Sequence, residues 1–150
     1  MRIPERRRRP QAGFSLTEMM IAIAVAGLML AIALPRIRET LVSRDLQSAR
    51  AALANMYARA RINALQTRKS TTINFSGTQV WVTAPVTGGL DTVGAVVDLG
   101  VLYGVAITAS TPTITVLATG LSNMAATATI SVTRSGKSDS VQISGYGRLQ

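Results

Sequence analysis

The chain contains no cysteine and no histidine among its 150 residues. Without thiols it cannot form a disulfide, and without imidazole or thiolate groups it lacks the usual zinc ligands and nucleophile–base pairs. Acidic residues are also few, 7 against 16 basic ones. The acids of the C-terminal half, Asp91, Asp98 and Asp139, are scattered with no paired spacing. We therefore expect no enzymatic activity, no metal site and no cofactor.

An uncharged apolar run occupies residues 19–34. Counted from Phe14, the apolar stretch has 21 residues, and as a helix with a rise of about 1.5 Å per residue it spans a hydrocarbon core of roughly 30 Å. It carries one charge, on Glu18. A carboxylate near the end of a membrane span is costly, so this residue needs a partner or a position at the interface.

A basic leader precedes the run. Its five arginines, at positions 2 and 6–9, outweigh Glu5 and give residues 1–13 a net charge of +4. Basic residues favour the cytoplasmic side of a membrane span. The sequence therefore predicts a single span with the N-terminus inside and the rest of the chain outside.

The junction between leader and run reads Gly13-Phe14, then Ser-Leu-Thr and Glu18. These features resemble the prepilin signature of type IV pilins and of type II secretion pseudopilins. The resemblance implies that a prepilin peptidase cuts after Gly13 and methylates the new amino group of Phe14. It also implies a single-pass protein of the inner membrane with a periplasmic C-terminal domain, which is later extracted into a periplasmic or surface filament with other pilin or pseudopilin subunits.

Two of these residues also have a physical argument. Gly13 has no side chain to exclude from a narrow peptidase cleft. Once Phe14 is the N-terminus it bears a positive amine, and Glu18 of a neighbouring subunit would neutralise that charge in an apolar filament core. The alternative for Glu18 is a solvated position at headgroup depth.

Other interpretations of the N-terminal segment remain open. A cleaved secretory signal would use the small residues Ala31 and Ala33, but Glu18 at the front of the run and Pro35 just past the cut argue against it. A plain single-span anchor leaves the junction at Gly13 unexplained. A twin-arginine signal lacks the residues that normally frame the arginine pair.

Beyond Pro35 the pattern becomes amphipathic. Apolar residues recur at steps of three and four, at Leu46, Ala49, Leu53, Met56 and Ala60. This spacing predicts one face of a helix, and we expect a single helix over about residues 15–67, kinked at Pro35. The arginines off this face, Arg44, Arg50, Arg59 and Arg61, either are solvated or pack on neighbouring subunits.

After residue 69 the composition shifts to Thr, Ser, Val, Ile and Gly, which is typical of strands. We expect strands at 71–75, 79–84, 93–97, 101–108, 113–117, 127–133 and 140–144, with turns at 76–78 and 135–138 and loops at 85–91 and 120–126. The predicted fold is α+β and pilin-like, a long helix packed on an antiparallel sheet. Its parts are a leader (1–13), a transmembrane and assembly helix (14–35), an amphipathic continuation (36–69) and a β-rich domain (70–150).

The C-terminal segment 141–149 is similar to the last strand of GspH/FimT-class minor pseudopilins, in which a Gly-Arg pair recurs, here Gly147-Arg148. This resemblance favours a minor pilin or pseudopilin of a type IV pilus or a type II secretion system. The alternative is a minor pilin that binds DNA during uptake, with Arg134, Lys137 and Arg148 as the phosphate contacts. The sequence does not decide between pilus and secretion system.

Overall fold

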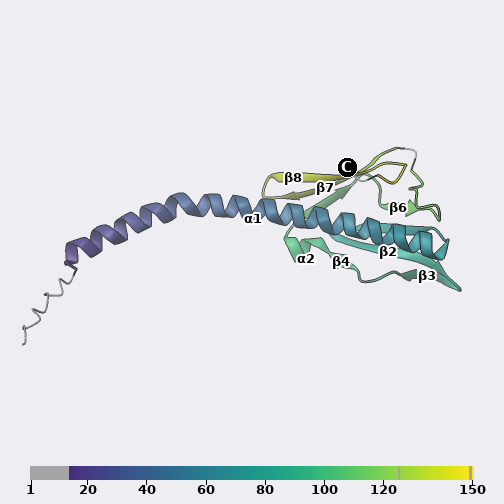
Figure 1. Cartoon of the computed structure of the whole chain (residues 1–150), viewed down its shortest axis with the longest axis horizontal. Helices are drawn as coiled ribbons and strands as arrows, with labels where there is room; N and C mark the ends of the chain where they lie inside the picture. The colour runs from purple at the N-terminus through teal and green to yellow at the C-terminus, as the bar shows by residue number, and fades with distance from the viewer. Residues whose placement is uncertain (1–13, 125, 149) are drawn as a thin grey trace, which may run out of the picture. The chain divides into compact units, whose positions relative to one another are not determined.

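The computed structural model describes residues 14–124, 126–148 and 150. Within these residues a long helix, α1 (Leu16–Thr67), is followed by eight strands and a short helix, α2 (Leu99–Tyr103) (Figure 1). The chain divides into two units, the first ending at Arg38 and the second running over Glu39–Gln150. Each unit is considered by itself below.

The described part of the first unit is the N-terminal portion of α1 and the two residues before it. Its side chains are exposed throughout, including the whole apolar run. By length and composition the helix can cross a membrane. The single helix expected over 15–67 is confirmed, because α1 continues through Pro35. The kink at Pro35 stays a prediction.

In the second unit α1 buries one face against strands. All five residues of the predicted apolar face are buried, and Tyr57 and Ala64 extend it. Ala49, Ala60 and Ala64 are fully covered. Since alanine projects only one methyl group, these positions leave room for the larger side chains of the buried cluster.

The strands form two antiparallel sheets. The first has the order β3-β2-β1-β6, with β4 pairing on β2, and the second has the order β5-β7-β8. The first sheet comprises β1 (Thr71–Ser76), β2 (Gln79–Val86), β3 (Gly89–Thr92), β4 (Val97–Asp98) and β6 (Thr113–Val116). The second comprises β5 (Ala106–Ala109), β7 (Ala128–Arg134) and β8 (Lys137–Ile143). The predicted α+β architecture, a long helix packed on antiparallel strands, is confirmed, with the sheet divided in two.

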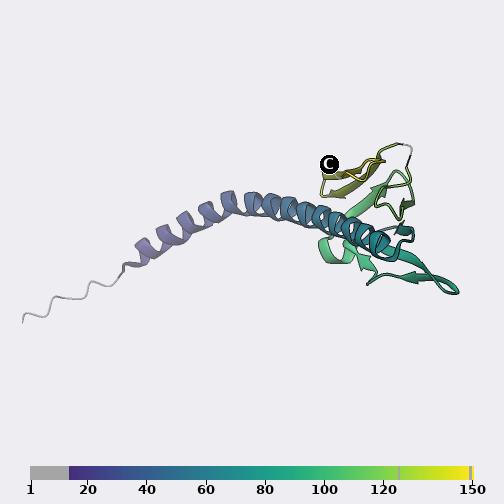
Figure 2. The same ribbon diagram turned by 45° about the vertical axis from the view of Figure 1, so that its right-hand side comes forward.

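Both sheets contribute to one core under the helix. Ile73, Val82 and Ile114 of the first sheet and Ile130 and Val132 of the second belong to the same buried cluster as the α1 face. Buried and less buried residues alternate along β2 and β7, as a period of two requires. In Figures 1 and 2 both sheets lie along the same portion of α1.

Two hairpins follow the expected turns. β1 and β2 pair up to Ser76 and Gln79, so their turn is Gly77-Thr78. β7 and β8 pair up to Arg134 and Lys137, and the two turn residues between them both have positive φ, 50° and 78°. Two consecutive positive φ values define a type I′ turn, whose twist matches that of the flanking strands. Because this turn is tight, β8 begins three residues earlier than predicted.

The predictions for residues 85–108 were wrong in two places. Residues 85–91 are not a loop, because β2 continues to Val86 and β3 begins at Gly89, and no strand covers 93–96. All four side chains of β3 are exposed, so this strand is made by backbone pairing and leaves no burial pattern in the sequence. Similarly, residues 101–108 are not one strand but α2 followed by β5.

The caps of α2 explain why residues 101–108 do not form one strand. The Asp98 carboxylate accepts a hydrogen bond from the Val101 N–H, and Gly104 ends the helix in the left-handed conformation with φ +63°. The hydrogen bond from the Thr78 hydroxyl, followed by that from Val101, lowers the pKa of Asp98. These contacts favour a short helix over the strand that the β-branched residues predicted.

The last strand was predicted to end at residue 144, which agrees with the structure to within one residue. β8 ends at Ile143, and the chain turns back so that Gln150 exchanges two backbone hydrogen bonds with Gln142, of 2.9 and 3.0 Å. The turn is closed by a bond from the Gly147 N–H to the Ser144 carbonyl. Gly147 adopts φ +72°, and a Cβ at Gly145 would lie 2.5 Å from the Met124 carbonyl oxygen, so both positions favour glycine.

We predict that Leu53→Asp unfolds the second unit, because it places an unpaired charge at a side chain that is 5% exposed, at a cost on the order of several kcal/mol. Ala51→Asp, on the exposed face of the same helix, is the matched control. Thermal melts of residues 36–150, followed by circular dichroism, test this. A Leu53→Asp protein that melts cooperatively at the parent temperature would contradict the assignment of the core.

Candidate functional site

The N-terminus of α1 carries a reciprocal pair of hydrogen bonds between Ser15 and Glu18. The Ser15 N–H donates to Glu18 Oε2 at 2.8 Å, and the Glu18 N–H donates to Ser15 Oγ at 3.2 Å. This is a capping box, in which each residue satisfies a backbone N–H that the helix leaves unpaired. The sequence carried its signal, a serine followed three residues later by glutamate, but the sequence analysis missed it.

The capping box has two consequences for the proposed processing site. First, α1 begins at Leu16, so Phe14 and Ser15 lie outside the helix. Second, the Glu18 carboxylate has a donor within its own chain, at the helix end where the macrodipole favours negative charge. Gly13, the predicted cleavage position, lies outside the described residues. Phe14 is exposed.

The three predicted DNA contacts are not gathered in one place. Arg134 and Lys137 flank the β7–β8 turn, whereas Arg148 follows the other end of β8. The seven residues of β8 separate these ends by about 20 Å. The structure therefore brings Arg134 and Lys137 together and leaves Arg148 apart.

Arg134 also has structural partners. Its Nη1 donates to the Asp45 carboxylate of α1 and to the carbonyl of Tyr103 at the end of α2. Lys137 Nζ lies 3.5 Å from Ser43 Oγ. Arg134 thus links α1, α2 and the β7–β8 hairpin. Its positive charge is largely neutralised by the Asp45 carboxylate.

The glycine of the Gly147-Arg148 pair has a packing role that the sequence did not reveal. Gly147 has φ +72°, and a Cβ added there would meet Tyr57 Oη at 2.8 Å and the Gly120 carbonyl at 3.0 Å. Tyr57 is 2% exposed and burial raises its pKa, while the charge of Arg61 opposes the shift. Arg61 Nη1 also donates to the Gly147 carbonyl at 3.5 Å. The C-terminal turn therefore packs against α1, through Gly147.

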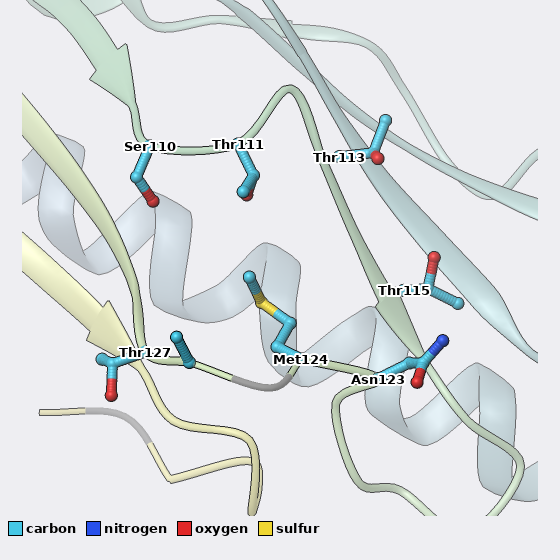
Figure 3. A pocket seen from close by; sticks show the side chains of 8 residues that line it. Ser110, Thr111, Thr113, Thr115, Asn123, Met124 and Thr127 are labelled. Carbon is cyan, nitrogen blue, oxygen red and sulfur yellow. The ribbon is translucent and has the colours of Figure 1, made fainter.

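A hydroxyl-lined cleft of about 540 Å³ lies between β6 and the start of β7 (Figure 3). Its lining residues are Ser110, Thr111, Thr113, Thr115, Asn123, Met124, Ala126 and Thr127. None of these side chains is charged. Within the described part of the chain, no group of three or more acidic residues is placed to hold a metal ion. The cleft therefore offers hydrogen bonds but no acid–base chemistry.

Comparison with known proteins shows one sequence motif and the fold. Residues 8–34 match the family model of the prokaryotic N-terminal methylation motif. A crystal structure of the type IV minor pilin FimU of Pseudomonas aeruginosa is similar, with a TM-score of 0.61 and 21% identity over 72% of this chain and 88% of that chain. The minor pseudopilin EpsH of the Vibrio cholerae type 2 secretion system is similar with a TM-score of 0.53 and 14% identity, over 68% and 94%. No curated protein matches the sequence.

These comparisons and the geometry agree on the fold and the motif. The chain carries an N-terminal methylation motif at the start of an apolar helix, and that helix continues into a pilin fold. Its fold is similar to those of this minor pilin and this minor pseudopilin.

We predict that Gly147→Ala destabilises the second unit by about 1–3 kcal/mol, because the new methyl group meets Tyr57 and the Gly120 carbonyl in a backbone conformation already unfavourable for alanine. Gly136→Ala is the matched control, since its φ is +78° but nothing lies within 4 Å of its Cβ. Urea denaturation of the two variants measures the difference. Equal losses of stability would show that the contact with Tyr57 is unimportant.

Proposed function

We propose that this chain is a minor pilin or pseudopilin, a structural subunit that enters or initiates a type IV pilus or a type II secretion pseudopilus. The observation that carries the proposal is the continuity of α1. One helix joins the methylation motif to the pilin-like unit. Its first portion exposes an apolar surface that only lipid or other apolar helices can cover.

Processing follows from the same segment. A prepilin peptidase cuts after Gly13, removes the basic leader 1–13 and methylates the amine of Phe14. Residues 14–35 anchor the subunit in the inner membrane, and residues 36–150 lie in the periplasm. On assembly the amine of Phe14 pairs with Glu18 of a neighbouring subunit, whose Oε1 remains available beside the bond that Oε2 makes to Ser15.

The structural role is favoured over DNA binding. Phosphate binding depends on several cations acting on one backbone. In this protein Arg134 is paired with Asp45 and Arg148 lies at the far end of β8 from Lys137. The patch expected from the sequence is therefore not assembled within one subunit.

We predict that Gly13→Val blocks processing, because a branched side chain does not fit a site shaped for glycine. N-terminal sequencing of the membrane-extracted protein measures this. The wild type should begin at methylated Phe14, and the variant should retain Met1. A wild-type N-terminus at Leu34, or an intact leader, would overturn the proposal.

We predict that Glu18→Ala inserts into the membrane at least as well as the wild type, since a charge leaves the apolar span, yet enters filaments poorly because the amine of the neighbour loses its partner. Ser15→Ala is the matched control, because it removes the Ser15 Oγ that accepts from the Glu18 N–H but keeps the carboxylate and its bond from the N–H of residue 15. Quantifying each variant in membrane and sheared-filament fractions separates the two effects. Normal incorporation of Glu18→Ala would contradict the pairing.

A further inference from the structure

The hydroxyl-lined cleft of the second unit continues into a second cleft. This second cleft has a volume of about 410 Å³ and shares three lining residues with the first, Met124, Ala126 and Thr127. Its other lining residues are Ser144, Gly145 and Tyr146. The two clefts therefore form one groove, which begins beside β6 and ends at the C-terminal turn. We call it the hydroxyl groove.

The side chains of the hydroxyl groove are polar but uncharged. Five of those that line the first cleft carry the hydroxyl of serine or threonine, and Asn123 adds a carboxamide. Figure 3 shows these side chains arranged around Met124. Each hydroxyl can both donate and accept a hydrogen bond, and so can the carboxamide. The groove therefore suits a ligand that carries many neutral donors and acceptors.

One hydroxyl of the groove has no partner within the described part of the chain. Thr111 Oγ1 is buried there and makes no hydrogen bond. A buried polar atom without a partner costs free energy. Because a threonine side chain has three staggered rotamers, rotation about χ1 can turn this hydroxyl toward the groove. A bound ligand would then supply the hydrogen bond that the fold does not.

Tyr146 adds an aromatic ring at the other end of the groove, where it is 81% exposed. Two contacts hold its turn against the segment that lines both clefts. The Ser122 hydroxyl donates to the Ser144 carbonyl at 2.7 Å, and a Cβ at Gly145 would lie 2.5 Å from the Met124 carbonyl oxygen. An exposed ring beside hydroxyls offers a flat apolar surface on which the C–H face of a sugar can stack.

A phosphate-bearing ligand fits the hydroxyl groove less well. Nucleic acids and other phosphate ligands are bound mainly through cations. None of the residues that line the two clefts is charged. The groove therefore favours a neutral ligand.

An extended peptide also fits less well, because a peptide that adds a strand needs free backbone N–H and C=O groups at a sheet edge. Part of the β6 edge is already occupied. The Asn123 N–H donates to the Thr115 carbonyl at 2.8 Å. Just beyond β6, the Leu117 N–H donates to the Leu121 carbonyl at 2.8 Å. The groove thus offers side-chain hydroxyls more than free backbone.

We propose that the hydroxyl groove binds an uncharged sugar chain. Its hydroxyls, including that of Thr111, and the Asn123 carboxamide bond the hydroxyls of the sugar, and Tyr146 stacks on a sugar ring. The site lies wholly within the second unit and does not depend on a role in a filament. This ligand chemistry is shared by the glycan strands of a cell wall and by polysaccharides outside the cell.

Isothermal titration calorimetry of the full chain tests the site, in a detergent without a sugar headgroup. The probes are maltohexaose, cellohexaose and chitohexaose, which are uncharged chains of glucose or N-acetylglucosamine. We expect at least one of them to bind at millimolar concentration. Tyr146→Ala should weaken that binding about tenfold, whereas Tyr146→Phe keeps the ring and should bind nearly as the wild type.

Thr111→Val separates binding from folding. It should weaken sugar binding by about threefold or more, yet leave the melting temperature unchanged or raised, because it removes an unpaired buried hydroxyl. Thr92→Val is the matched control and should bind as the wild type. Thr92 is exposed on β3, which lies three strand spacings from β6 across the first sheet, about 14 Å.

Three results would overturn the proposal. The first is that none of the hexamers binds at millimolar concentration. The second is binding that Thr111→Val and Tyr146→Ala both leave unchanged. The third is binding of an extended peptide of alternating threonine and valine with no binding of sugar, which would assign the groove to strand addition.

Sedimentation with insoluble material identifies the source of the sugar. Pelleting with purified peptidoglycan sacculi, reduced in Tyr146→Ala, would support the site and place its ligand in the cell wall. The same behaviour with cellulose or chitin particles would support the site and place its ligand outside the cell. Equal pelleting of the wild type and Tyr146→Ala on all of these materials would contradict the proposal, while leaving the filament role intact.

Discussion

A single helix that meets two different surroundings is the constraint on which the rest of this structure depends. Over residues 19–34 every position of α1 is apolar and exposed, which suits lipid or a bundle of identical helices. From Leu46 to Ala64 only one face is apolar, and the two sheets bury it. Isolated helices and small sheets are marginal in water, so in the second unit neither is expected to persist without the other.

The N-terminal end of that helix has a different problem, the charge of Glu18 in an apolar segment. The capping box with Ser15 reduces the cost by giving the carboxylate a backbone donor and a favourable helix dipole. In a filament the amine created by processing would add a full positive charge nearby. The Glu18 carboxylate would thus be stabilised by its cap in the membrane-anchored subunit and neutralised by an amine in the filament, as the proposed function requires.

The sequence predicted those features that depend on local periodicity. The α1 face was readable because five apolar residues recur at helical spacing, and the hairpins were readable from their turns. It did not predict β3, whose side chains are all exposed, or α2, whose five residues form a helix because Asp98 and Gly104 cap it. Gly147 could not be assigned a role, because its contact with Tyr57 joins positions 90 residues apart and is set by the folded chain. The capping box of Ser15 and Glu18, by contrast, has a clear sequence signal, which was missed.

The central claim is that this chain is a filament subunit anchored by its processed apolar helix. The most direct measurement is mass spectrometry of sheared filaments or secretion pseudopili from the producing cells. The account predicts peptides of this chain in that fraction, at low abundance beside a major subunit, with the N-terminal peptide beginning at methylated Phe14. Its presence in the membrane alone, with no trace in filaments under conditions where the major subunit is assembled, would contradict the account.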